Sequence, residues 1–148
     1  MATTAVTRAQ VSQAVAQLMP RIIQGVQLDF FVKQRITQTQ LLVLLAIHAA
    51  ERCTMGTLAR NMHVRMPTAT GIVTRLARAG YVRRCPDPED RRQVFVELTD
   101  KGRAFIQAFQ GVIRARWQKV LKMLEPKALE AFHSVILQLT RQLGGTGP

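Results

Sequence analysis

The side chains best suited to chemistry in this chain form a hydroxyl-rich and cationic segment between residues 65 and 75. Threonine and glycine are poor helix formers, and lysine or glutamate would serve solubility better on a helix that only faces water. On a helix that enters the major groove of DNA, small and hydroxyl side chains allow close approach and hydrogen bonding to base edges. We therefore expect this segment to contact DNA, the alternative being a solvated helix surface. The expected contact residues are Arg65, Pro67, Thr68, Thr70, Gly71, Thr74 and Arg75.

Three arginines in this region have alternatives that the sequence leaves open. Arg75 either contacts a phosphate or forms a salt bridge with the hairpin that we expect to follow. Arg83 and Arg84 are neighbours on an expected strand, so their side chains point to opposite faces. At most one of these two side chains can therefore face a DNA duplex.

The charge balance of the chain also favours a polyanionic partner. Lysine and arginine total 21 against 9 aspartate and glutamate, which gives a formal net charge of +12. Residues 52–86 contain seven arginines and no acidic residue, and residues 101–122 form a second acid-free run with six basic residues. A potential of this sign attracts nucleic acid or an anionic membrane surface. We expect double-stranded DNA, although a general DNA-coating or architectural protein would explain the charge equally well.

Sequence motifs for catalysis and for metal binding are not recognised in the chain. There is no glycine-rich phosphate loop, nucleophile elbow or paired acidic motif, so we expect no enzyme, no catalytic residue and no cofactor. His48, His63 and His133 are scattered, without cysteine or acidic partners at ligand spacing. We therefore expect no metal site.

The two cysteines and the hydropathy pattern indicate a cytoplasmic location. Cys53 and Cys85 lack CxxC spacing, and the N-terminal residues lack the continuous apolar stretch of a signal peptide. The longest apolar run, residues 41–47, is far shorter than the roughly 20 residues that span a bilayer. Cys85 follows two arginines, which predicts a lowered thiol pKa. A redox-sensing role for Cys85 is an alternative to an ordinary strand residue.

Helical periodicity and capping signals mark the first two helices. Apolar residues at helical spacing over residues 11–26 predict an amphipathic helix, in which Pro20 introduces a kink or separates two helices. Thr37 and Gln40 have the spacing of a capping box. The helix that they open, residues 41–51, is apolar nearly all round and is expected to be buried.

The middle of the chain carries the signals of a helix-turn-helix followed by a hairpin. Thr54 is placed to cap a short third helix, and Pro67 to open a fourth helix that closes at Gly80. Residues 81–85 and 93–98 contain strand formers on either side of a turn-rich loop. This order predicts a winged helix-turn-helix in an α+β, mostly α, fold.

The remaining residues predict a helical dimerisation region. Thr99 is placed to cap a long helix that we expect to end at Pro126, and the last helix carries apolar residues at three- and four-residue steps over 129–143. Such a stripe needs covering, which favours a two-fold dimer over packing onto the first helix. We expect one domain, 1–148, with a DNA-binding lobe at 37–98 and a dimerisation region at 1–36 and 99–148.

Three segments together resemble the MarR family of winged-helix regulators. The run from Val64 to Val82 is similar to the family's recognition helix and first wing strand. Residues 87–92, Asp-Pro-Glu-Asp-Arg-Arg, and residues 96–102 are similar to its wing and to the turn into its long helix. The sequence departs from the family pattern at Ala77 and Ala79, where charged residues are common. The resemblance implies a homodimer on a pseudopalindromic operator, often released by a small molecule or by thiol oxidation.

The wing residues of the sequence predict a second contact with DNA. Asp90 and Arg92 lie two apart, so on an extended strand they share a face and the carboxylate can orient the guanidinium. Arg91 then points the other way. We expect Arg92 to enter the minor groove, the alternative being a surface salt bridge with Asp90.

The family resemblance further implies an effector site between the helices and the DNA-binding lobe. Phe30, Phe31 and His48 are the candidates to bind a small aromatic or anionic effector there. The resulting hypothesis is a transcriptional repressor that acts as a homodimer and excludes RNA polymerase from its operator, with no association with membranes.

Overall fold

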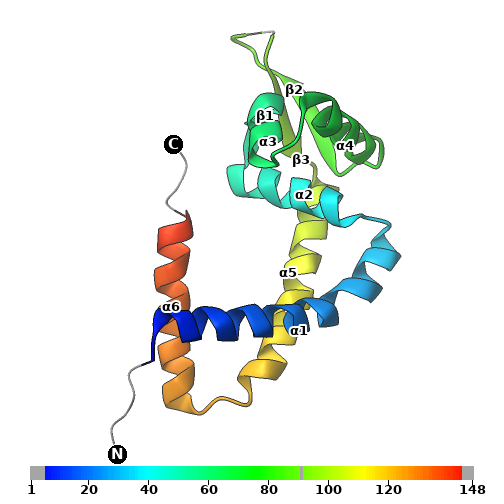
Figure 1. The fold of residues 1–148 in the computed structure, drawn as a ribbon. Helices are drawn as coiled ribbons and strands as arrows, with labels where there is room; N and C mark the ends of the chain where they lie inside the picture. The colour runs from blue at the N-terminus through cyan, green and yellow to red at the C-terminus, as the bar shows by residue number, and fades with distance from the viewer. Residues whose placement is uncertain (1–5, 91, 145–148) are drawn as a thin grey trace, which may run out of the picture. The chain divides into compact units, whose positions relative to one another are not determined.

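The computed structural model describes residues 6–90 and 92–144. It contains six helices and one three-stranded sheet in the described residues, which confirms the mostly helical winged-helix fold. The chain forms two compact units, residues 1–112 and 113–148, and each is described by itself. The division into a lobe at 37–98 and a dimerisation region stays a prediction. In chain order the elements are α1 (Arg8–Gln34), α2 (Gln38–Ala50), β1 (Arg52–Thr54), α3 (Met55–Asn61), α4 (Met66–Arg78), β2 (Val82–Pro86), β3 (Val94–Leu98), α5 (Asp100–Leu121) and α6 (Pro126–Gly144) (Figure 1).

Helix α1 is continuous through Pro20, so the alternative of two separate helices is wrong. The proline removes one backbone hydrogen bond, and the intact turns on both sides of it keep the 27-residue helix in one piece. The helix begins at Arg8, where the Thr7 hydroxyl accepts from the Gln10 N–H at 3.3 Å. It ends where Arg35 adopts a left-handed conformation.

Helix α2 begins with the capping box that the sequence predicts. The Thr37 hydroxyl accepts from the Gln40 N–H at 3.2 Å, and the Gln40 side chain accepts from the Thr37 N–H at 2.9 Å. The expectation of burial all round is wrong, because Leu42 is 54% exposed and His48 is exposed. The apolar side chains of this helix outnumber the positions on its core-facing side. The buried positions are Leu41, Val43, Leu44 and Ile47.

The sheet has the strand order β1-β3-β2, and both pairings are antiparallel. Its β1 strand was not expected from the sequence, because three residues are too few to display an alternating pattern. Arg52 pairs with Glu97, and Cys53 pairs with Val96. Alternation along β3 buries Val96 and Leu98 against the helices and leaves the other face of the sheet more open.

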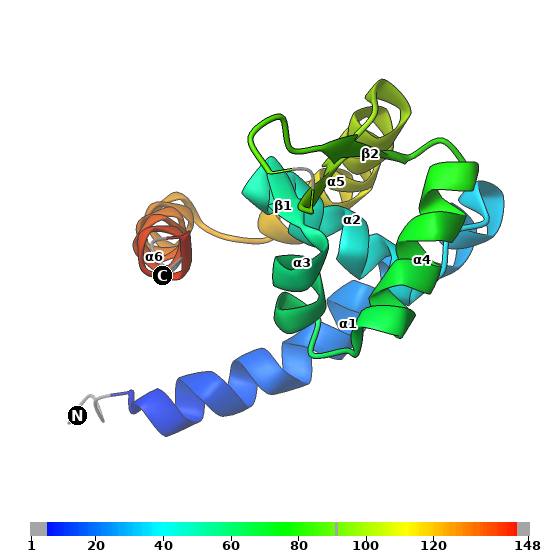
Figure 2. The same ribbon diagram turned by 90° about the horizontal axis from the view of Figure 1, so that it is seen from above.

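The core lies between α2, α3, α4, the inner face of the sheet and the first turns of α5. Helices α3 and α4 pack side by side, and the chain runs from α4 directly into β2 (Figure 2). The Phe30 ring lies 5.3 Å from that of Phe105 and 5.8 Å from that of Phe109, between ring centroids, which joins α1 to α5. The fully buried side chains are those of Val43, Leu44, Ile47, Leu58, Val73, Leu76, Val96 and Ile106.

Thr99 joins the end of α4 to the start of α5. Its hydroxyl donates to the Gly80 carbonyl at 2.5 Å and accepts from the Gly102 N–H at 3.1 Å, so it caps α5 as expected. Gly80 has a φ of +80°, which only glycine adopts readily. Gly102 lies so close to the chain that a Cβ there would meet the Tyr81 carbonyl oxygen at 2.1 Å.

The expected end of the long helix at Pro126 is wrong. Helix α5 ends at Leu121, and Pro126 is instead the first residue of α6. Proline is well suited to a first helical position, because its missing N–H would have no partner there. The unit from residue 113 onward is held in part by Trp117 and Phe132, whose ring centroids lie 5.8 Å apart.

Candidate nucleic-acid interface

Helix α4 has one face in the core and one face open to solvent. Ala69, Ile72, Val73 and Leu76 are buried, whereas Thr68, Thr70 and Arg75 are exposed and Gly71 and Thr74 are partly exposed. This division follows the helical period of the sequence. The structure therefore brings the candidate residues of α4 together on one accessible surface.

Gly71 has no packing role among the residues that the structure describes. A Cβ at this position would meet no atom within 4 Å. Glycine in a helix interior costs roughly 1 kcal/mol relative to alanine. The glycine leaves room on the exposed side of α4 for close approach by another molecule.

The start of α4 presents a cation that is not used for capping. Arg65 occupies the N-cap position, is exposed and makes no side-chain capping hydrogen bond. Pro67 lies in the first turn, as the sequence predicts. Met66, between them, is 48% exposed. The residues at the beginning of the helix thus leave the guanidinium directed to the surface.

Thr74 and Arg84 form a contact between α4 and β2 that sequence reasoning missed. Arg84 Nη2 donates to Thr74 Oγ1 at 2.8 Å and to the Thr70 carbonyl oxygen at 3.4 Å. Thr74 Oγ1 in turn donates to the same carbonyl at 2.7 Å. The Thr74 hydroxyl is therefore already engaged on both its donor and its acceptor side.

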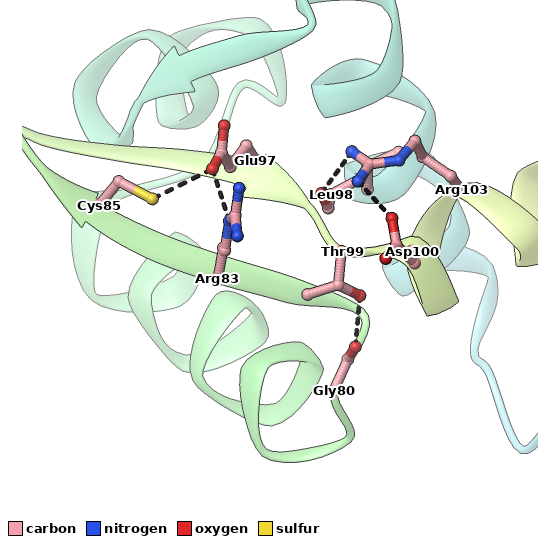
Figure 3. A network of polar contacts seen from close by, with 8 residues as sticks. All are labelled: Gly80, Arg83, Cys85, Glu97, Leu98, Thr99, Asp100 and Arg103. Carbon is pink, nitrogen blue, oxygen red and sulfur yellow. Dashed lines mark hydrogen bonds and ion pairs between the residues drawn. The ribbon is translucent and has the colours of Figure 1, made fainter.

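Arg83 points to the opposite face of the sheet, as the alternation predicts. Its Nε lies 2.5 Å from Glu97 Oε1, and the Cys85 thiol donates to the same oxygen at 3.2 Å (Figure 3). These contacts form a small polar network across β2 and β3. The Arg83 charge is thus paired with a carboxylate on the side away from α4.

The prediction of a lowered thiol pKa for Cys85 is wrong. The hydrogen bond to Glu97 raises the pKa of the Cys85 thiol, and burial of the thiol and the negative charge of Glu97 act in the same direction. The positive charges of Arg83 and Arg52 oppose this shift and do not reverse it. The same network lowers the pKa of Glu97, first through Cys85 and then through Arg83. A thiol that is held protonated is a poor redox sensor.

The wing loop does not have the conformation assumed for Asp90 and Arg92. The chain is turned rather than extended here: Asp90 Oδ1 accepts from the Arg92 backbone N–H at 3.0 Å, and the Asp90 carbonyl accepts from the Gln93 N–H at 2.9 Å. No ion pair joins the side chains of these two described residues. Asp90 therefore shapes the backbone of the loop instead of orienting a guanidinium, and Arg91 lies outside the described residues.

Arg92 nevertheless lies near the helix-turn-helix. It is exposed and lines a surface pocket of about 350 Å³ together with Thr54, Gly56 and Met66. Arg75 is also exposed, and no ion pair connects it to the wing in residues 6–90 and 92–144. The salt-bridge alternative for Arg75 thus has no support among the described contacts.

The effector candidates take part in different contacts. Phe30 packs against the rings of Phe105 and Phe109. His48 lines a pocket of about 650 Å³ at the end of α2, with Arg52 and Arg103 among its other lining residues. The side chain of Phe31 lies outside the described part of the chain.

Two further observations bear on the site. No helix within the described residues is long and apolar enough to cross a membrane. No group of three or more histidine, cysteine or acidic side chains is arranged to hold a metal ion in that same part of the chain.

The chain matches one family model and is similar to named transcriptional regulators. Residues 36–94 match the model of the MarR family. The chain is 25% identical over 113 residues to the uncharacterized HTH-type transcriptional regulator YfiV of Bacillus subtilis, and the match covers 76% of this chain and 71% of YfiV. It is 36% identical over 74 residues to the HTH-type transcriptional repressor NicR of Pseudomonas putida, about half of each protein.

Solved structures share the fold. RV1404 from Mycobacterium tuberculosis superposes with a TM-score of 0.79 at 21% identity over the whole of both chains. A mutant of MepR from S. aureus, bound to an oligodeoxyribonucleotide, gives a TM-score of 0.65 at 19% identity and covers 94% of this chain and 99% of that one. NadR in complex with 4-hydroxyphenylacetate gives a TM-score of 0.59 at 22% identity and covers 95% of this chain and 96% of that one. The resemblance to MarR-type winged-helix proteins is confirmed.

Proposed function

We propose that this chain, whose residues 36–94 match the model of the MarR family, binds an operator sequence in double-stranded DNA as a homodimer and represses transcription. The observation that carries the proposal is the exposed face of α4. It combines two exposed threonines, a glycine with open space around it and cations at both ends, Arg65 and Arg75. The acid-free run of residues 52–86 contains this helix.

The chemistry of that face suits a major groove. Thr68 and Thr70 offer hydroxyls that donate to or accept from base edges, and Gly71 permits the helix backbone to approach closely. Arg65 and Arg75 supply charge for phosphates that flank the groove. A helix that only faced water would gain stability from alanine, lysine or glutamate at these positions.

The wing supports a second contact with the duplex. The loop between β2 and β3 projects beyond the helices of the lobe (Figure 1). Arg92 is exposed at its base, and Arg91 belongs to the same proposed contact. We assign these arginines to the adjacent minor groove, where negative potential is focused. Asp90 contributes by accepting a hydrogen bond from the Arg92 backbone N–H.

Dimerisation follows from the apolar surface of α6. Leu129, Ile136 and Leu139 are 41%, 42% and 46% exposed, and Leu143 is 76% exposed. Their spacing forms a stripe along one helix, and a second copy of the chain presents the same stripe. A two-fold dimer covers both stripes and places two α4 helices on a pseudopalindromic site.

Regulation by a small-molecule effector is part of the proposed function. NadR was solved in complex with 4-hydroxyphenylacetate, a small aromatic anion. In this chain the pocket beside His48 is lined by the cations Arg52 and Arg103 and by the carboxylates Glu51 and Glu97, so the two arginines are the groups that would pair with an anion. We propose that such a ligand lowers operator affinity, and Phe30 and Phe31 are further candidates to contact it.

Selection from a randomised duplex library, followed by competition, tests the proposal. We expect a consensus with two related half-sites, about 10 base pairs apart from centre to centre. Unrelated duplex should compete at least about a thousand times less well than the selected sequence. A general DNA-coating protein, which the charge of +12 also allows, would yield no consensus and equal competition.

A further inference from the structure

Arg84 belongs to β2, yet its guanidinium lies against α4. In the sheet, Arg84 lies opposite Val96 of β3, and the Val96 side chain is buried on the face that the helices cover. Its Nη2 donates at 2.8 Å to the Thr74 hydroxyl and at 3.4 Å to the Thr70 carbonyl. Arg84 is still exposed, so the contact lies at the surface, where α4 and the wing meet.

The neighbouring arginine provides an internal contrast. Arg83 faces the other side of the sheet and pairs with Glu97 at 2.5 Å. No acidic group forms an ion pair with Arg84 in the described part of the chain. One of the two adjacent positive charges is therefore neutralised within the protein, and the other is held beside the exposed face of α4 by neutral oxygen atoms.

The contact also changes the role that the sequence suggests for Thr74. A threonine hydroxyl has one proton to donate, and here that proton goes to the Thr70 carbonyl at 2.7 Å. The oxygen accepts from Arg84 on its other side. Thr74 is therefore suited to orienting a guanidinium rather than to reading a base.

We propose that Thr74 is a positioning residue that holds Arg84, and that Arg84 donates to a backbone phosphate at the edge of the groove occupied by α4. The inference rests on the proposed function. Both contacts to α4 use Nη2, and a guanidinium has five N–H donors in all, so donors remain for a phosphate. Thr74 lies in the second half of α4, whereas the N-terminal residues of a recognition helix are those that meet base edges.

The experiment measures how the affinity for the selected duplex depends on salt concentration. Each phosphate contact contributes about 0.9 to the slope of log affinity against log salt. Arg84→Gln should reduce that slope by about 0.9 for each bound chain, while the matched control Arg83→Gln leaves it unchanged. Melting curves of both variants show whether either substitution affects folding.

A double-mutant cycle tests the positioning role of Thr74. Thr74→Val keeps the shape of the side chain and removes the hydroxyl, and it should weaken binding by about tenfold, as expected for loss of a hydrogen bond to a charged group. Thr74→Ser keeps the hydroxyl and should bind as the wild type does. In the Arg84→Gln background, Thr74→Val should have no further effect.

The outcomes separate this inference from the function on which it rests. If the wild-type chain selects no duplex, the proposed function fails and the inference fails with it. If the wild-type chain is selective but Arg83→Gln and Arg84→Gln change the slope equally, only the role of Arg84 is overturned. Additive effects of Thr74→Val and Arg84→Gln would overturn the positioning role of Thr74.

Discussion

Adding one methyl group to α5 should either destabilise or stabilise the protein, depending on which of two glycines receives it. A Cβ at Gly102 would lie 2.1 Å from the Tyr81 carbonyl oxygen and 3.3 Å from the Leu98 Cβ. Ordinary contact begins near 3.4 Å, so the backbone must move. At Gly111, in the same helix, the added Cβ would meet no atom of the described residues within 4 Å.

The expected magnitudes have opposite signs. Alanine gains about 1 kcal/mol over glycine in a helix interior, and this gain applies at Gly111, whereas Gly102 lies in the first turn of α5 and gains less. Overpacking typically lowers the free energy of unfolding by about 1–3 kcal/mol. The clash at Gly102 involves backbone atoms, so its cost is expected at the upper end of this range or above it. Gly102→Ala should therefore lower the free energy of unfolding by roughly 2 kcal/mol or more. Gly111→Ala should raise it by up to about 1 kcal/mol.

The free energy of unfolding of each variant is measured by urea and thermal unfolding. All samples have the same protein concentration, because the unfolding of the proposed dimer would depend on concentration. For a chain of this length a change of about 1 kcal/mol corresponds to about 2–4 °C in Tm. Gly102→Ala should also weaken the hydrogen bond that the Thr99 backbone N–H donates to the Tyr81 carbonyl at 3.1 Å. The reasoning is refuted if Gly102→Ala is as stable as the wild type, or if both variants shift in the same direction.

Three further predictions follow from caps, charge and exposed surface. Thr37→Ala removes the capping box of α2 and should lower the free energy of unfolding by about 1 kcal/mol, measured by urea titration; no change would contradict the cap. Glu97→Ala removes the acceptor and the negative charge that raise the pKa of Cys85, so alkylation of that thiol at a fixed mildly alkaline pH should become faster; an unchanged rate would show that Glu97 has no effect on the thiol. Because the pKa of Glu97 itself is lowered, any stability it contributes is present above its ordinary pKa and is lost as the pH falls through the lowered value. Replacing Leu139 and Leu143 together by glutamate should convert a species of twice the 16.6 kDa chain mass into one of a single chain mass in light scattering, and persistence of the larger species would exclude this stripe as the dimer contact.

Local signals in the sequence predicted much of the fold. Thr37, Thr54 and Thr99 each cap a helix through a hydrogen bond to an N–H three residues later, and such a contact depends only on neighbouring residues. The missing prediction of β1 and the misplaced end of α5 have a different cause. A three-residue strand depends on its partner, and Pro126 is compatible both with ending one helix and with beginning the next.

The site was predictable only where a single helix determines it. The exposed face of α4 follows from the helical period, whereas the contact between Thr74 and Arg84 depends on how β2 lies against α4. The wrong expectations for Asp90 and Cys85 share this origin. Asp90 was placed on an extended strand that is in fact a turn, and the partner of Cys85 comes from the opposite strand, twelve residues away.

The most direct test of the central claim is the affinity of Thr70→Ala for the selected duplex and for unrelated duplex. Thr70 is exposed on α4, and its side chain can be removed without opening the core. If α4 reads base edges, the variant should lose roughly 1–3 kcal/mol of affinity for the selected sequence and almost none for unrelated DNA. Equal losses on both duplexes, or no loss on either, would contradict base reading by this face of the helix.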